Sequence, residues 1–433
     1  MTRQRIRTTV IAAAIASTLS GAAHAVRIDY TVDAGYERDD NVTLSEDAPI
    51  EQNIARLGVG FTLEQASSTV QASVVGRIDH RRYEDIYDDM TDRMLQGRVN
   101  WMIVPDRLGF VVEDSYGVQS INRFNPDSPD NRQQVNVLSL GPSLHFRAGQ
   151  ALQGLAELRY INSDAEITED FNSDRLLAAL RLTRDIDATS ALSFNVQAQN
   201  IDFDNDLVAR DHNRFEAFAS YRRTYRMFDM LVDAGYAHLD YDDGGSRGSP
   251  LVRAELGWNP SERSRFSINA ASQLSDAAIG TLDAIGESTG LPSSVMTGST
   301  TVTASAYEQR SLGAQYTYTG TRTVLSIFGQ AHELEYVDVD AANEESRSAG
   351  VSLRYRLRPT LVLGASASVD RNEYGSPVDR RETNHLYTLG LEKSWSRNWS
   401  SSLTYTRYER STPTPLASFE QNVIYLSLAY RNR

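Results

Sequence analysis

Apolar and polar side chains alternate with a period of two along most of the chain. In residues 53–63, one face carries the apolar side chains, and the opposite face carries polar or small ones such as Arg56 and Thr62. Residues 94–103 and 351–357 repeat this pattern. Successive side chains of a strand point to opposite faces, so a period of two predicts strands with one apolar and one polar surface.

The connections between these segments alternate between short and long. Residues 105–107, 320–322 and 358–360 form short turns, whereas residues 84–92 and 164–174 form longer, strongly acidic loops. Short periplasmic turns that alternate with longer external loops are typical of outer-membrane barrels. The sequence therefore predicts an all-β protein, a transmembrane antiparallel up-and-down β-barrel of about 20 strands (roughly 18 to 20), with both termini in the periplasm.

Two further observations favour a barrel over a soluble β-sandwich or propeller. The alternating segments are longer than ordinary strands of about 5–6 residues, and their second face is too polar for a dry core. Four tryptophans lie within a few residues of the predicted turns, on the face assigned to lipid: Trp101, Trp258, Trp395 and Trp399. Amphipathic rings prefer the headgroup level, so these side chains predict an aromatic girdle at the periplasmic interface.

The alternation is interrupted over residues 277–304. This long segment between two predicted strands is weakly hydrophobic and rich in Gly, Ser and Thr. Loops of such length are uncommon and often functional. We expect it either to fold into the lumen as a constriction or to stand outside as a flexible loop, and the sequence leaves both possibilities open.

The N-terminal sequence predicts export from the cytoplasm. Three arginines precede a small-residue and apolar stretch that ends in Ala-His-Ala at residues 23–25. This is the pattern of a secretory signal peptide, so we expect residues 1–25 to be removed and residues 26–433 to form a barrel in the cell outer membrane. The chain has no cysteine, which excludes a lipoprotein anchor, disulfides and thiolate chemistry.

The sequence gives little support for an enzyme or for a cofactor site. The net charge of −14 argues against a nucleic-acid partner, because phosphates require basic patches. Residues 286–290 match the G-x-S-x-G pattern of serine hydrolases, but no strand and helix flank them as that motif requires. The histidines are scattered and none shows zinc-binding spacing. We therefore expect no enzyme activity, no metal and no cofactor.

The polar face of the predicted strands carries charges of both signs. Twelve charged residues are expected to line the lumen: Arg56, Arg77, Arg98, Arg159, Arg181, Arg222, Arg253, Arg354, Arg356, Glu157, Glu216 and Glu255. Mixed charges along a tube can attract, orient or screen a polar solute. They can equally serve only to solvate the lumen and to pair across strands.

Three stretches of the chain carry a family resemblance. They are GYERDDNV at residues 35–42, EDSYGVQSINRFNPDSPDNRQQVNVLSLGP at residues 113–142, and YERSTPTPLASFEQNVIYLSLAY at residues 408–430. They resemble the outer-membrane β-barrel porin family found with bacterial exopolysaccharide secretion systems (β-barrel porin 2 type). The resemblance implies a barrel, of about 18 strands in relatives, that lets a secreted polysaccharide out, and it implies no catalytic residues.

The end of the chain departs from what barrels usually show. The assembly machinery commonly reads an aromatic last residue, whereas here Tyr430 is followed by Arg-Asn-Arg at residues 431–433. We expect this departure to affect the efficiency of assembly and not the fold.

The expected partners follow from the barrel and from the resemblance. They are outer-membrane lipid and lipopolysaccharide, the barrel assembly machinery, an exopolysaccharide and periplasmic export components. The function that we expect is a conduit for exopolysaccharide export. A passive diffusion porin for small solutes shares the same sequence features and is the alternative.

Overall fold

The computed structural model describes residues 26–122, 124–149, 151–205, 209–283, 297–298, 303–337, 342–414 and 417–432. The predicted signal peptide, residues 1–25, lies outside the described residues, and so does the G-x-S-x-G match at residues 286–290. Cleavage of the signal peptide therefore stays a prediction.

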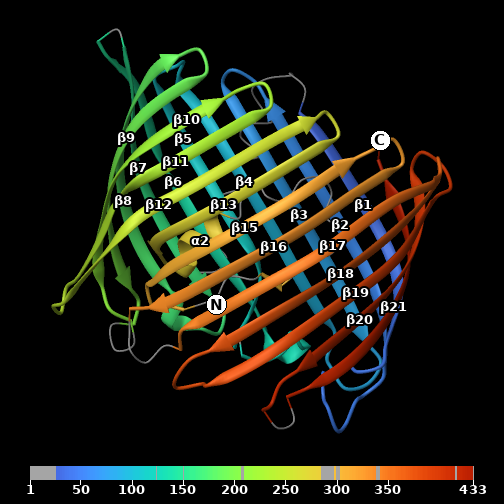
Figure 1. Cartoon of the computed structure of the whole chain (residues 1–433). Coiled ribbons are helices and arrows are strands. Elements are labelled where there is room, and N and C mark those ends of the chain that lie inside the picture. Colours follow the sequence, from blue (N-terminus) through green and yellow to red (C-terminus); the bar gives the residue numbers. More distant parts are fainter. Residues whose placement is uncertain are drawn as a thin grey trace.

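Twenty long antiparallel strands form a closed barrel (Figure 1). Each strand pairs with its neighbours along the chain, and the last pairs with the first. The strands are β1 Arg27–Asp39, β2 Gln52–Ala66, β3 Val70–Tyr83, β4 Met90–Val104, β5 Leu108–Ser120, β6 Arg132–Ala148, β7 Leu152–Ala165, β8 Ser173–Asp187, β9 Ser190–Phe203, β10 His212–Thr224, β11 Phe228–Tyr241, β12 Ser246–Ser261, β13 Ser264–Ser275, β15 Tyr307–Thr319, β16 Thr323–Tyr336, β17 Glu344–Arg358, β18 Leu361–Tyr374, β19 Arg380–Ser394, β20 Trp399–Ser411 and β21 Phe419–Arg431. This confirms the predicted fold class, at twenty strands rather than the eighteen or so that the resemblance implies.

The remaining described elements are short. They are the α-helix α2 (Ala277–Asp283), the 3₁₀ turns η1 (Pro129–Asn131) and η2 (Glu169–Phe171), and β14 (Thr297–Gly298). β14 pairs in parallel with β5, at Val118 and Gln119, so it is not a strand of the antiparallel barrel. Within the described parts of the chain, no helix is long and apolar enough to cross a membrane.

The seam between β1 and β21 uses residues beyond the last aromatic position. The ladder runs from Thr31 opposite Arg431 to Asp39 opposite Val423. Asn432 extends it, because its backbone N–H donates to the Tyr30 carbonyl at 3.1 Å and its side-chain amide donates to the Ile28 carbonyl at 3.0 Å. The polar end that follows the last tyrosine thus helps to close the barrel.

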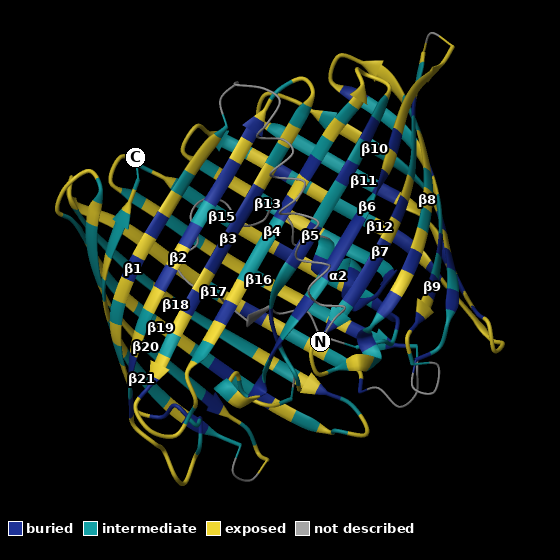
Figure 2. Ribbon diagram, turned by 180° about the vertical axis from the view of Figure 1, so that it is seen from behind, coloured by how far each residue is buried: buried dark blue, intermediate teal, exposed yellow. Residues whose placement is uncertain are grey.

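Exposure alternates along the strands as the sequence predicts (Figure 2). On β2, Leu57 and Val59 are 52% and 45% exposed, whereas the side chain of Arg56, which precedes them, is 12% exposed. The exposed apolar face suits lipid, and the closed ladder leaves no backbone edge unpaired in hydrocarbon. The polar face is turned toward the lumen and is called the inner face below.

The four tryptophans all lie at the end of the barrel that carries the short turns. Each is about half exposed or more, from 46% at Trp399 to 67% at Trp395. Trp258 stacks on Phe266 with ring centroids 5.4 Å apart, and Trp399 meets Tyr430 edge-on at 5.3 Å. Such a band of exposed rings suits the membrane–water interface.

The topology predicts which loops can be labelled on intact cells. Asp88, exposed in the loop between β3 and β4, lies at the long-loop end, and Arg107, exposed in the turn between β4 and β5, lies at the other. The Asp88→Cys variant should react with a membrane-impermeant maleimide on intact cells. The Arg107→Cys variant should react only after permeabilisation. The chain has no native cysteine, so any labelling comes from the introduced one. Labelling on intact cells at position 107 but not at position 88 would contradict the proposed orientation of the barrel.

The two faces predict opposite responses to a new charge. Leu353 on β17 is 37% exposed on the apolar face. A lipid-facing arginine near the bilayer midplane costs about 2–4 kcal/mol, so Leu353→Arg should reduce the amount of assembled barrel. The matched variant Ser352→Arg, one residue away on the inner face, should assemble normally. Folded barrel in outer-membrane fractions can be measured by its heat-modifiable migration, and equal amounts of the two variants would contradict the assignment of faces.

Candidate functional site: the lumen and its inward segments

A buried ion-pair network lies on the inner face of the first three strands. Arg77 on β3 is 2% exposed and donates to both oxygens of Asp33 on β1, at 2.8 and 3.0 Å. It also donates to Asp79, at 2.6 and 3.0 Å. Gly58 on β2 lies between them, and a Cβ there would stand 2.1 Å from the Arg77 guanidinium. The glycine is therefore what lets Arg77 reach across β2.

Most of the other predicted inner-face charges also have polar partners. Six ion pairs join positions on the same strand or on strands one or two apart: Arg56–Glu37 at 2.7 Å, Arg98–Glu113 at 3.3 Å, Arg159–Glu157 at 2.6 Å, Glu216–Arg214 at 3.2 Å, Arg253–Asp233 at 3.0 Å and Arg354–Glu392 at 3.1 Å. Arg181 donates to Asn195 at 2.6 Å. Arg222, Arg356 and Glu255 are exposed and form no ion pair within the described ranges. Whether any of the twelve contacts a solute stays a prediction.

The segment that interrupts the alternation begins with a buried anchor. Asp276, just after β13, is 3% exposed. It accepts a hydrogen bond from Arg175 at 2.7 Å and lies 3.6 Å from Arg214. It also caps α2, because it accepts from the backbone N–H groups of Ala278 and Ile279. Burial opposes its charge, but the two guanidinium groups hold the pKa of Asp276 below its ordinary value.

α2 then packs inside the barrel on an apolar part of the inner face. The buried cluster consists of Val135, Val137, Ile161, Ala165, Phe171, Ala277 and Ala278. On β6 and β7 the inner face is thus apolar near the long-loop end, unlike the polar inner face that the sequence predicts. The exception has a physical reason, since the helix removes this patch from water. For residues 277–283, the structure selects the inward alternative over an external loop.

A second segment crosses the mouth of the barrel. The loop between β5 and β6, residues 121–131, is called the inward loop. Asn131 shapes it: its side-chain oxygen accepts from the Asn122 N–H at 2.8 Å, and its amide donates to the carbonyls of Asn122 and Pro126 at 2.8 and 3.0 Å. In the preceding loop, between β3 and β4, burial raises the pKa of Tyr87 to about 12, and the charge of Asp130 in the inward loop and a hydrogen bond to it add to the shift.

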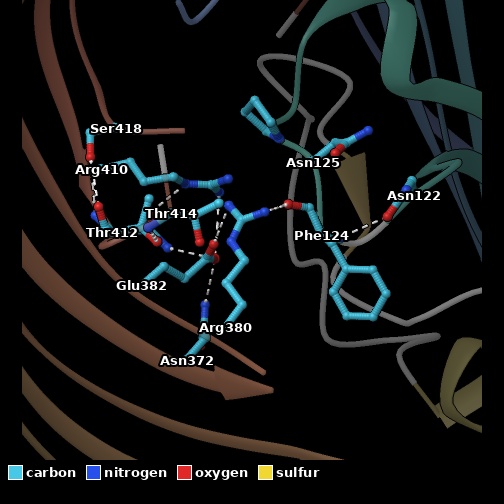
Figure 3. Close-up of polar contacts among 12 residues, drawn as sticks. Asn122, Phe124, Asn125, Asn372, Arg380, Glu382, Arg410, Thr412, Thr414 and Ser418 are labelled. Carbon is cyan, nitrogen blue, oxygen red and sulfur yellow. Dashed lines mark hydrogen bonds and ion pairs between the residues drawn. The ribbon is translucent and has the colours of Figure 1, made fainter. Parts of the chain in front are cut away.

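The inward loop is fastened to the far wall (Figure 3). Arg380 on β19 donates to the Phe124 carbonyl at 2.6 Å, and the Phe124 ring meets Tyr374 edge-on at 5.0 Å. Glu382 lies between two arginines, 2.8 Å from Arg380 and 3.6 Å from Arg410. β19 lies seven pairings from β5 around the wall, through β4, β3, β2, β1, β21 and β20. The contact therefore spans the lumen.

The two inward segments leave a cavity of about 720 Å³ against the opposite wall. Asp127 and Gly280 border it on one side, and the inner faces of β13 and β15–β20 border it on the other. Its polar lining, apart from carboxylates, consists of Asn269, Tyr307, Gln309, Ser311, Gln330, His332, Ser346, Ser348, Asn372, Asn384 and Tyr408. No arginine or lysine of the described chain borders it, and none of the twelve charges predicted from the sequence does.

The sequence analysis missed these functional residues for identifiable reasons. Arg175 and Arg214 share the inner-face parity of Arg181 and Glu216, so alternation alone could have included them. Asp276 immediately precedes the interrupted segment, and that position was a usable signal. On β6, Val135 and Val137 are apolar at inward positions, and Leu138 is apolar at an outward one. The alternation of apolar and polar residues is therefore lost there, which the sequence itself shows. Nothing in the sequence indicated the partner of Arg380, because that partner is a backbone carbonyl.

The fold defines the class: the protein is an outer-membrane β-barrel with the architecture of channels and transporters, and it belongs in the cell outer membrane. Its sequence matches no family model and no curated protein. The structure is similar to a mutant of the ferric enterobactin receptor PfeA from Pseudomonas aeruginosa, with a TM-score of 0.51, 11% identity, and coverage of 93% of this chain and 80% of that one.

Two other solved structures align over similar lengths. The FrpB iron transporter from Neisseria meningitidis aligns with 93% of this chain and 82% of its own, at 10% identity and a TM-score of 0.49. Acinetobacter baumannii OccAB4 aligns with 94% and 98% of the two chains, at 9% identity and a TM-score of 0.38. At these identities the likeness establishes the fold alone.

The Asp276 anchor predicts how the lumen responds to loss of one charge. Asp276→Asn keeps a side-chain oxygen that can cap α2 but leaves the buried guanidinium group of Arg175 without its counter-ion, and leaves Arg214 with Glu216 alone. Breaking a buried pair costs about 3–5 kcal/mol, so α2 should detach and the single-channel conductance in planar bilayers should rise. Asp243→Asn, which breaks an exposed pair with Arg210, is the control and should leave the conductance unchanged.

The pH response of the same anchor has a defined sign. Because the folded pKa of Asp276 is lowered, its contribution is complete above the ordinary carboxyl pKa and is lost only as the pH falls through the lowered value. Conductance should therefore stay constant between about pH 5 and 8. A rise in conductance within that window would contradict the anchor.

Proposed function

We propose that this barrel is the outer-membrane passage for an exopolysaccharide. The observation that carries the proposal is the cavity beside the inward segments, whose lining is dominated by amides and hydroxyls. A hydroxyl-rich polymer can exchange its hydrogen bonds to water for bonds to such groups. A passage needs binding weak enough for release, which many neutral contacts provide better than one strong ionic site.

The width and the charge pairing of the barrel agree with this proposal. Barrels of about 16–18 strands already enclose an aqueous channel, and larger ones hold inward segments as well. On the inner face of β1–β12, arginines such as Arg77 and Arg159 are already satisfied by carboxylates. These paired groups keep the wall hydrated without presenting a strong electrostatic trap to a passing chain.

One observation favours the second candidate, a passive diffusion porin for small solutes. The inward loop and α2 narrow the lumen, and a cavity of about 720 Å³ accommodates a small molecule as readily as a few sugar residues of a polymer. The two candidates differ in what the cell loses when the barrel is absent.

Deletion of the gene separates the two candidates. Surface polysaccharide, measured by extraction and sugar analysis, should be abolished, while growth on small nutrients as sole carbon sources should not change. A plasmid copy of the wild-type gene should restore the polysaccharide and serves as the control. Unchanged polysaccharide together with slower uptake of small nutrients would overturn the export proposal in favour of the diffusion porin.

A further inference from the structure

We propose that the cavity between the inward segments and the β13–β20 wall is a binding subsite for uncharged sugar residues. The proposal deepens the function above and rests on it for the identity of the polymer. The chemistry of the subsite is argued separately, from the residues that line the cavity. It implies that the transported glycan is neutral where it meets this wall.

The lining offers hydrogen-bond donors and acceptors that can exchange their bonds to water for bonds to a sugar. The amides of Asn269 and Gln309 make no hydrogen bond to the described protein, and both side chains face the cavity. Gln330 donates to Ser348 at 3.3 Å, and Asn372 donates to Glu382 at 3.3 Å, so each of these amides keeps its oxygen as an acceptor. A sugar hydroxyl both donates and accepts, which suits this mixture.

A fixed aromatic side chain borders the same space. The Tyr408 hydroxyl donates to the Asn384 side-chain oxygen at 3.3 Å and accepts from Arg410 at 3.3 Å. Its ring packs edge-on against Phe419 with centroids 5.1 Å apart. These contacts hold the side chain in place before a ligand arrives, which lowers the entropic cost of binding. An aromatic body with a polar end matches a sugar ring with apolar and hydroxylated faces.

The charges around the cavity disfavour an acidic sugar. The carboxylates of the lining are Asp127, Glu344 and Asp370, beside the histidine His332, and Asp127 is already paired with Arg132 at 2.8 Å. The arginines just beyond the lining already have carboxylate partners, because Arg132 pairs with Asp127 and both Arg380 and Arg410 pair with Glu382. An anionic sugar would therefore meet Glu344 and Asp370 of the lining directly, and like charges in proximity raise the free energy of the complex.

Two of the predicted inner-face cations lie away from this site. Arg222 and Arg356, which form no ion pair within the described ranges, occupy the short-turn ends of β10 and β17 and do not border the cavity. They cannot neutralise an acidic sugar bound beside Asp370. The β1–β12 side and the cavity thus differ in chemistry: inner-face arginines of β1–β12 such as Arg77 and Arg253 are paired with carboxylates, whereas the cavity itself is lined by neutral groups, one histidine and carboxylates.

Block of single-channel current by oligosaccharides tests the subsite. The purified full-length barrel is inserted into planar bilayers, and maltohexaose, which is neutral, is compared with hexagalacturonate, which is acidic. We expect maltohexaose to block at a concentration at least tenfold lower. Gln309→Ala should raise its blocking concentration severalfold, and Asp370→Asn should narrow the difference between the two sugars. Glu373→Gln, three residues along β18 on the outer face, is the matched control and should change neither value.

The outcomes separate this proposal from the proposed function. Three results would each overturn the subsite. The first is equal or stronger block by hexagalacturonate, and the second is no block by maltohexaose. The third is that the Gln309→Ala and Asp370→Asn variants behave like Glu373→Gln. If these measurements support the subsite while gene deletion leaves surface polysaccharide intact, the export proposal fails and the sugar subsite of a diffusion channel remains. Circular dichroism of each variant establishes that it is folded before its current is measured.

Discussion

The rest of the structure depends on one constraint, that no backbone hydrogen-bonding group can be left unpaired in hydrocarbon. Twenty strands satisfy it only because β1 and β21 pair along most of their length. Closure fixes the register of every strand relative to its neighbours. Fixed register then decides which side chains meet across the inner face, as when Gly58 stands between Asp33 and Asp79 and leaves room for Arg77.

The closed wall also determines where charge can be placed. A charged side chain on the outer face within the membrane faces lipid, so inner-face positions suit the arginines, where carboxylates of the same or of a neighbouring strand pair with them. Arg159 with Glu157 and Arg253 with Asp233 show the result on the β1–β12 side. The same logic extends to the inward helix, because buried Arg175 and Arg214 require an anion and Asp276 supplies it. The anchor of α2 is therefore a continuation of the wall's charge pairing.

The sequence predicts those features of the fold that repeat locally. Alternation in residues 53–63 or 351–357 identified strands and faces, because each strand meets two different solvents along its whole length. The partners within the lumen could not be predicted, since they depend on three-dimensional closure: Asp276 lies 101 residues from Arg175, and Phe124 lies 256 residues from Arg380. The lining of the cavity was not predicted, because the predicted lumen residues were chosen for their charge and most of this lining is neutral.

The apolar patch under α2 determines where the inward helix lies in the lumen. Val135 and Val137 keep the period of a strand, yet they turn inward, where water would make them costly to expose. They require a cover, and α2 provides it only on the side where Arg175 and Arg214 can hold Asp276. The described part of the opposite wall carries a smaller buried apolar cluster, Tyr307, Leu334 and Tyr336, and borders the cavity of about 720 Å³. The position of the inward helix is thus a consequence of which inward residues need to be covered.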